Sequence, residues 1–221
     1  MAQKIKPNAY RLGLTVPWSS RWFYKKSLRY FLAEDQVIRD IVRKKILQAG
    51  IAAIDIERTG TSVRVNVRAA RPGLIIGRGG KGIDELKDAV VKAVQSLRRK
   101  HHIAEKLVLN LNIEELKRFE VSAPVLAQQY AFDLEKRLPY RRNMKRLIET
   151  ILQNRDVKGV KMKVGGRLDG AEIARSDSMT KGKMPLQTLR ANIDYGEATA
   201  FTSYGTVGIK LWIYKGDIFD K

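Results

Sequence analysis

Residues 76–83 read Ile-Gly-Arg-Gly-Gly-Lys-Gly-Ile, a glycine-rich loop that joins two apolar segments. Ahead of the loop, Pro72 and Gly73 break a strand, and a short apolar turn follows them. Beyond the loop, apolar side chains recur at the spacing of one helix face, at Ile83, Leu86, Val90, Val94 and Leu97. The sequence therefore predicts a short helical turn, a glycine loop and a long amphipathic helix in succession, and this combination decides the fold around it.

The loop has the chemistry of a nucleic-acid backbone contact. Gly77 and Gly80 let the main chain approach a phosphate closely, because glycine carries no Cβ. The N–H groups at the start of the next helix, with Arg78 or Lys81, are expected to meet phosphates. The loop resembles the Gly-x-x-Gly signature of KH domains, and its predicted RNA-binding residues are Gly77, Arg78, Gly79, Gly80 and Lys81.

Other phosphate-binding motifs compete for the same residues. Gly77, Gly79 and Gly82 also satisfy Gly-x-Gly-x-x-Gly, the fingerprint of dinucleotide-binding folds. That fingerprint requires a strand running directly into the loop, whereas Pro72 and Gly73 intervene here. A nucleotide-hydrolysing P-loop is excluded, because Gly-x-x-x-x-Gly-Lys-Ser/Thr does not occur in the sequence. An ordinary glycine-rich turn in a basic protein is the remaining alternative.

The segments on both sides of the loop complete one domain. An apolar stripe beside basic residues predicts a helix from residue 28 to a stop at Gly50. Alternation of apolar and polar residues predicts a hairpin over residues 54–68 and a further strand over 107–113. The resulting order, helix-strand-strand-helix-helix-strand over residues 28–117, is that of the type II KH fold, which binds RNA.

The pattern resets around residues 114–122, where a domain boundary is expected. Two amphipathic helices follow, and Pro139 interrupts them. Strand-like segments come next, at residues 160–164, 189–195 and 207–213. Residues 118–216 are therefore predicted to form a second α+β domain of two helices and a mostly antiparallel sheet, with a short tail over residues 217–221.

Residues 1–27 combine cations with aromatic rings and show no sustained periodicity, which we interpret as an extended basic arm. Its aromatic residues suit stacking on RNA bases and packing on the following domain equally well, so both interpretations stay open. The cations of the arm predicted to bind RNA are Lys4, Lys6, Arg11, Arg21, Lys25 and Lys26.

A second basic cluster lies between residues 136 and 146 and contains no carboxylate. Its members are Lys136, Arg137, Arg141, Arg142, Lys145 and Arg146. Arg141 and Lys145 are four residues apart, as are Arg142 and Arg146, so a helix through this segment would gather them into a ridge. A run of charge is often only a solvated face, but here it predicts phosphate contact without base specificity.

The composition favours a polyanionic partner. The 221 residues are 44% hydrophobic, enough for real cores, and 43 Lys and Arg against 23 Asp and Glu give a formal net charge of +20. No apolar run approaches the roughly 20 residues that span a bilayer, and residues 1–7 lack the apolar core of a secretory signal. We therefore expect a cytosolic protein that binds nucleic acid rather than a membrane.

No residues suggest catalysis, a metal site or a cofactor. The absence of cysteine removes disulfides, zinc knuckles and thiolate nucleophiles together. His101 and His102, the only histidines, are adjacent rather than four apart and lie in a polar stretch typical of a solvated loop. No acidic residue is paired with a base or a nucleophile, so we expect a protein that is not an enzyme and has no cofactor.

The whole chain resembles the bacterial small ribosomal subunit protein three family, over roughly residues 1–218. Beyond the loop, the resemblance rests on the Ala-Arg-Pro-Gly of residues 70–73 and the Tyr-Arg-Arg-Asn-Met-Lys of residues 140–145. It also rests on the Gly-Ala-Glu-Ile-Ala-Arg of residues 170–175 and the Pro-Leu-Gln-Thr-Leu-Arg-Ala of residues 185–191. Between the glycines of the loop, Gly79 stands where a second basic residue is common in the family.

The resemblance implies a structural protein in the head of the small ribosomal subunit, located in cytoplasmic ribosomes. Its implied partners are small-subunit ribosomal RNA, messenger RNA, and proteins ten and fourteen of the same subunit. The residues matching those that line the messenger RNA entrance channel and help unwind structured messenger RNA are Arg141, Arg142 and Lys145.

Two functions of other classes remain as alternatives. A free-standing regulator or processing factor with a KH fold would bind isolated RNA without associating stably with ribosomes. A dinucleotide-dependent enzyme would bind its cofactor at high salt, whereas RNA binding weakens steeply as salt rises.

Overall fold

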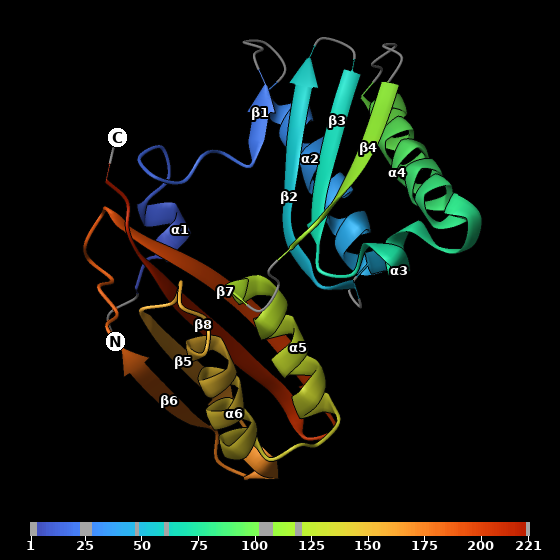
Figure 1. The fold of residues 1–221 in the computed structure, drawn as a ribbon. Helices are drawn as coiled ribbons and strands as arrows, with labels where there is room; N and C mark the ends of the chain where they lie inside the picture. Colours follow the sequence, from blue (N-terminus) through green and yellow to red (C-terminus); the bar gives the residue numbers. More distant parts are fainter. Residues whose placement is uncertain are drawn as a thin grey trace. The chain divides into compact units, whose positions relative to one another are not determined.

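The computed structural model describes residues 4–22, 28–46, 49–59, 62–101, 108–117 and 121–219. Contacts between residues divide the chain into two compact units (Figure 1). The first unit is Trp18–Lys117, and the second joins Met1–Pro17 to Arg118–Lys221. Both contain helices and a sheet, which confirms the predicted two-domain α+β class.

The first unit has the predicted order of elements. They are α2 (Leu28–Ile46), β2 (Ile51–Thr59), β3 (Ser62–Ala69), α3 (Pro72–Ile76), the single turn η2 (Arg78–Gly80), α4 (Lys81–Lys100) and β4 (Val108–Glu115). The sheet order is β1-β2-β3-β4, with β2 and β3 antiparallel and β3 and β4 parallel. The short strand β1 (Ser20–Trp22), parallel to β2, was not predicted.

Helices α2 and α4 pack against each other and bury the apolar residues of the sheet. Alternation along β3 places Val63, Val65 and Val67 inside and leaves Arg64 and Arg68 exposed. Burying one side chain of this size stabilises the fold by roughly 1.5–3 kcal/mol. The period-2 pattern in the sequence thus fixes which face of the sheet carries charge.

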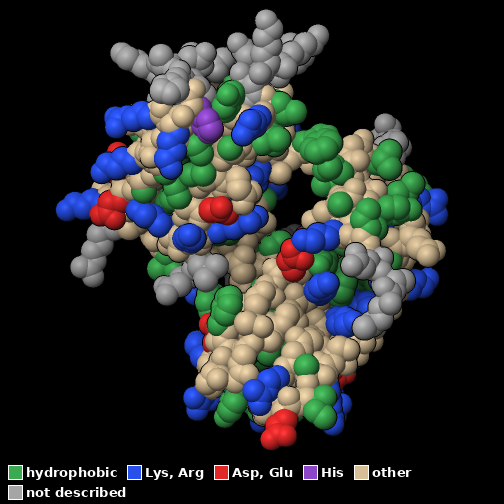
Figure 2. Space-filling view, turned by 180° about the vertical axis from the view of Figure 1, so that it is seen from behind, with side chains coloured by type: hydrophobic (Ala, Val, Ile, Leu, Met, Phe, Trp, Pro, Cys, Tyr) green, Lys and Arg blue, Asp and Glu red, His purple; other side chains and the backbone are tan. Residues whose placement is uncertain are grey.

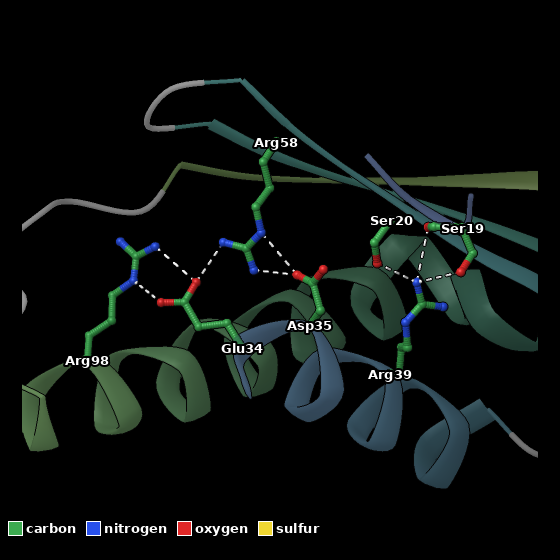
Figure 3. Close-up of polar contacts among 7 residues, drawn as sticks. All are labelled: Ser19, Ser20, Glu34, Asp35, Arg39, Arg58 and Arg98. Carbon is green, nitrogen blue, oxygen red and sulfur yellow. Dashed lines mark hydrogen bonds and ion pairs between the residues drawn. The ribbon is translucent and has the colours of Figure 1, made fainter. Parts of the chain in front are cut away.

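The first unit also buries a network of charged side chains (Figure 3). Arg58 on β2 donates to Glu34 at 2.6 Å and to Asp35 at 3.0 Å, and Arg98 on α4 donates to the same Glu34 at 2.7 Å. All four side chains are at most 8% exposed. Arg98 lies in the basic last turn of α4, but the carboxylate of Glu34 on α2 holds it inside.

Arg39 on α2 fixes the strand β1 to this unit (Figure 3). Its guanidinium donates to the Ile54 carbonyl at 2.7 Å, to the Ser19 carbonyl at 3.0 Å and to the Ser20 Oγ at 2.9 Å. One side chain of α2 therefore links the start of β1 to the middle of β2.

The second unit contains two helices and a four-stranded sheet, with one short helix from the start of the chain. Its elements are α1 (Pro7–Tyr10), α5 (Ala123–Glu135), α6 (Tyr140–Leu152), β5 (Gly159–Gly166), the turn η4 (Leu168–Gly170), β6 (Arg175–Gly182), β7 (Ala191–Thr202) and β8 (Gly205–Asp217). The sheet order is β6-β5-β8-β7, and all three pairs are antiparallel. Figure 1 shows α5 and α6 over one face of this sheet.

The structure corrects the expected arm over residues 1–27. Residues up to Pro17 belong to the second unit and Trp18 onward to the first, so the described part of the arm is divided between the two. Helix α1 packs on β7, and β1 extends the other sheet. At the opposite end, β8 runs to Asp217, the first residue of the expected tail.

Candidate nucleic-acid interface

The glycine loop is shaped by backbone angles that favour glycine. Gly77, Gly79 and Gly80 have φ of 68°, 64° and 80°. Gly77 ends α3, and α4 begins at Lys81, which is exposed. The N-terminal N–H groups of this 20-residue helix therefore lie beside the loop, an arrangement suited to an anion. The Arg78 side chain lies outside the described residues.

A third glycine of the motif serves helix packing. A Cβ added at Gly82 would lie 2.4 Å from the Ile75 carbonyl oxygen, so only glycine lets α4 approach α3 this closely. The loop is also preceded by helix α3 rather than by a strand. The preceding helix argues against the dinucleotide-binding alternative, which needs a strand running directly into the loop.

An open recess of about 300 Å³ lies between the start of α4 and the strands β3 and β4. It is lined by Arg64, Ile83, Asp84, Lys87, Asn110, Leu111 and Asn112. Arg64 and Lys87 add cations, and the asparagines add donors and acceptors of the kind that bind RNA bases. None of these residues was predicted as an RNA contact; the outward positions of Arg64 and Asn112 in their alternating strands were the available signal.

Helix α6 carries the basic ridge. Met144, Ile148 and Ile151 are fully buried against the core of the second unit, so the opposite side of the helix faces solvent. The four cations on that side are exposed; they are Arg141, Arg142, Lys145 and Arg146. The i, i+4 pairs expected from the sequence therefore share one helical surface.

Two of the six predicted ridge residues are not on this helix. Lys136 is the C-terminal cap of α5, and Arg137 lies in the link with a φ of 62°. Both are exposed, but Pro139 ends the link and starts α6 after them. The ridge on α6 therefore has four cations, and Lys136 and Arg137 precede the helix.

Hydrogen bonds fix the start of α6 against α5. The buried Tyr130 donates its hydroxyl to the Tyr140 carbonyl at 2.9 Å, and burial raises the pKa of that phenol. Asn143 donates to Asp133 at 3.1 Å. The ridge is thereby held in a defined orientation on the unit.

One ridge residue has a carboxylate partner. Arg141 donates to Asp177 on β6 at 3.1 Å, and this hydrogen bond raises the pKa of Arg141 above its ordinary value. Arg142, Lys145 and Arg146 form no ion pair within the described part of the chain. Their charge is therefore free for an external anion.

The predicted cations of the arm have different environments. Arg11 is 1% exposed, and its guanidinium donates to the carbonyls of Pro7, Leu186, Thr188 and Ala191. The prediction that Arg11 binds RNA is therefore wrong, because its donors are used inside the protein. Lys6 pairs with Glu197, and Arg21 lies 3.7 Å from Glu57. Lys4 is exposed, while Lys25 and Lys26 lie outside the described residues.

No helix among the described residues is long and apolar enough to cross a bilayer. The described residues also contain no group of three or more His, Cys, Asp or Glu side chains placed to hold a metal ion.

Comparisons with known proteins match both units. A family model described as "KH domain" matches residues 37–121, and one described as "Ribosomal protein S3, C-terminal domain" matches residues 130–213. Small ribosomal subunit protein uS3 of Clostridium novyi (strain NT) is 45% identical over 99% of this chain and 94% of its own length. The protein of the same name from Campylobacter concisus (strain 13826) is 45% identical over 100% and 90%, and that from Solibacter usitatus (strain Ellin6076) is 41% identical over 100% and 60%.

Proposed function

The chain belongs to the uS3 family of small ribosomal subunit proteins, and from this premise we propose that it lines the channel through which messenger RNA enters the ribosome. The family is one of structural ribosomal proteins rather than enzymes. In this proposal the first unit anchors the chain on ribosomal RNA, and the second presents the α6 ridge to messenger RNA.

The observation that carries the proposal is the exposed charge of α6. Arg142, Lys145 and Arg146 lie on a helix that is fixed by its buried face, and they have no carboxylate partner among the described residues. Such a surface binds phosphates of any sequence, as a channel for every messenger must. Arg141 adds a fourth cation, which is paired with Asp177.

The ridge suits unwinding without a catalytic group. Cations on a rigid helix can hold the phosphates of one strand while movement of the messenger draws the duplex apart. The energy then comes from the elongation cycle, and this chain contributes only position and charge.

The glycine loop and the recess beside it are the proposed contacts with ribosomal RNA. Gly77, Gly79 and Gly80 expose main chain beside the α4 N-terminus, and Lys81 adds a cation. Proteins ten and fourteen of the small subunit are the proposed neighbours, and cytoplasmic ribosomes the proposed location.

The test is translation of messengers with and without a stable hairpin by ribosomes that carry Arg142→Ala/Lys145→Ala. We expect slower passage through the hairpin, unchanged speed on the unstructured messenger and normal subunit assembly. A matched control is Lys44→Ala/Lys92→Ala, which removes two exposed lysines from helices of the first unit. Equal hairpin sensitivity in the variant and the control would refute the channel assignment.

The alternative of a free RNA regulator has its own test. In sucrose gradients of a lysate, a ribosomal protein travels with the small subunit at a salt level where other small-subunit proteins stay bound. Recovery of this chain at the top of that gradient would favour the regulator.

A further inference from the structure

The sheet of the second unit has one face covered by helices and one face that is open except at one end, where Met184 and Leu186 pack on Ala191, Ile193 and Tyr214. Helices α5 and α6 bury the inward residues of the sheet, such as Met162, Ile209 and Leu211. Figure 2, seen from behind the view of Figure 1, shows the lower, C-terminal part of the molecule from its other side. Backbone and small polar side chains dominate there, with Lys and Arg side chains among them.

Strand register places the residues of the open face in rows. One row is Ser178, Lys163, Lys210 and Glu197, read from β6 through β5 and β8 to β7. The row on one side is Thr180, Lys161, Trp212 and Tyr195, and the row on the other side is Ser176, Gly165, Gly208 and Thr199. Lysines, hydroxyls and glycines thus make up the central part of this face.

Lys163 and Lys210 stand directly opposite each other on β5 and β8. Directly opposed residues of an antiparallel pair have Cβ atoms about 4.5–5.5 Å apart, and like charges there destabilise the sheet. No carboxylate lies among the residues opposite or diagonal to Lys163 on this face. Lys163 therefore has a like-charged neighbour and no carboxylate beside it on this face.

The surrounding groups relieve this repulsion at Lys210 but not at Lys163. Glu197 faces Lys210 from β7 and attracts it, while its carboxylate also accepts hydrogen bonds from Lys6 and from the Tyr195 hydroxyl. Lys161 lies 5.9 Å from the centre of the Trp212 ring, which holds a third cation on the same face. An external anion is the remaining source of negative charge to offset Lys163.

We propose that this open face is a second RNA-binding surface, on which Lys163 and Lys210 bind the phosphates of a structured RNA. The inference rests on the RNA-binding function proposed above and adds a surface on the opposite side of the sheet from the α6 ridge. Phosphate oxygens accept from ammonium and hydroxyl groups alike, so Ser176, Ser178 and Thr180 complete the contact. Gly165 and Gly208 lie opposite each other and have no side chains, which leaves room for an RNA backbone to approach the sheet.

The first experiment measures affinity for a double-stranded RNA over a series of salt concentrations, with the full-length chain. Lys163→Gln/Lys210→Gln is compared with the control Lys44→Gln/Lys92→Gln, which removes the same charge from exposed positions of the first unit. Each lost phosphate contact lowers the slope of log affinity against log salt by about 0.7–0.9, so the double variant should lose about 1.4–1.8 and the control much less. Equal slopes in the two variants would overturn the proposal.

A ridge variant, Arg142→Gln/Lys145→Gln, separates this inference from the function on which it rests. If the ridge variant lowers the salt slope and the sheet variant does not, the inference fails alone. If neither lowers it, the RNA-binding function fails as well. Loss of binding to a polyglutamate peptide by the sheet variant, with RNA binding intact, would overturn the proposal and assign an acidic protein partner.

The repulsion itself gives a second readout with the opposite sign. Lys163→Gln should raise the urea midpoint of the second unit within the full-length chain in the absence of RNA, because it removes a like-charge neighbour without removing a carboxylate contact. The same change should weaken RNA binding. A midpoint that falls or stays the same would contradict the repulsion on which the proposal is built.

Discussion

Arginine has opposite surroundings in two regions of this protein. In the buried network of the first unit, Arg58 and Arg98 are almost inaccessible and are paired with carboxylates of α2. On the ridge of the second unit, Arg142 is exposed and unpaired among the described residues. The sequence shows both as basic residues on or near amphipathic elements. The difference teaches that access to solvent, rather than local charge density, separates a structural cation from one available to RNA.

The largest expected effect comes from breaking the buried network. Arg58→Ala leaves Glu34 and Asp35 with less compensation inside the first unit, and removal of one partner from a buried pair costs about 3–5 kcal/mol. The control Arg68→Ala removes an exposed partner of Asp55 on the next strand, where such a pair contributes about 0–1 kcal/mol. Urea unfolding of the first unit measures both, and equal losses would contradict the burial argument.

The next effect tests the glycine loop. Gly82→Ala forces a Cβ against the Ile75 carbonyl oxygen, and overpacking of this kind costs about 1–3 kcal/mol. RNA binding by the first unit should fall with it, because α3 and α4 set the loop. At Gly73 an added Cβ meets nothing within 4 Å, so Gly73→Ala serves as the control. Thermal unfolding with an RNA titration distinguishes the two.

On the ridge we expect a change in binding with almost none in stability. Arg142→Gln/Lys145→Gln should shift the free energy of unfolding by no more than about 0.5 kcal/mol, as is usual for exposed positions. The salt slope for single-stranded RNA should fall by about 1.4, since each lost contact accounts for about 0.7. A large loss of stability would mean that these side chains stabilise the fold, as Arg58 does.

The smallest effect is expected at the ion pair beside the ridge. Asp177→Asn removes the carboxylate that competes with RNA for Arg141, so affinity for single-stranded RNA should rise slightly. Between about pH 6 and 9 the gain should be constant, because the pKa of Arg141 lies far above this range with or without Asp177. Weaker binding would mean that Asp177 positions Arg141 for RNA.

Periodicity and glycine placement predicted the order of elements from α2 to β4 and most of the second unit, but not the strand β6 or the helix α1. They succeeded because the signal is local: Val63, Val65 and Val67 alternate within one strand, and Gly77 ends a short helix. The short strand β1 escaped prediction because three residues carry no period, and pairing with β2 and the hydrogen bonds of Arg39 define it.

Parts of the candidate site could not be read from the sequence for a different reason. Arg11 is held by carbonyls about 175–180 residues away along the chain, and no local pattern encodes such a contact. The same holds for Arg98, which meets a carboxylate on another helix. Charge alone makes every basic residue a candidate for RNA contact. Hydrogen bonds inside the protein occupy the donors of Arg11 and Arg98, so these two side chains are not available to RNA.

The hydrogen bonds of Arg11 also affect the order in which the two units fold during synthesis. Arg11 is synthesised long before three of its four acceptors, which lie in residues 186–191. The unit Trp18–Lys117 has all its own strands and helices before then and can fold first during synthesis. The segment around Arg11 must wait for residues 186–191, so the second unit is completed after the first.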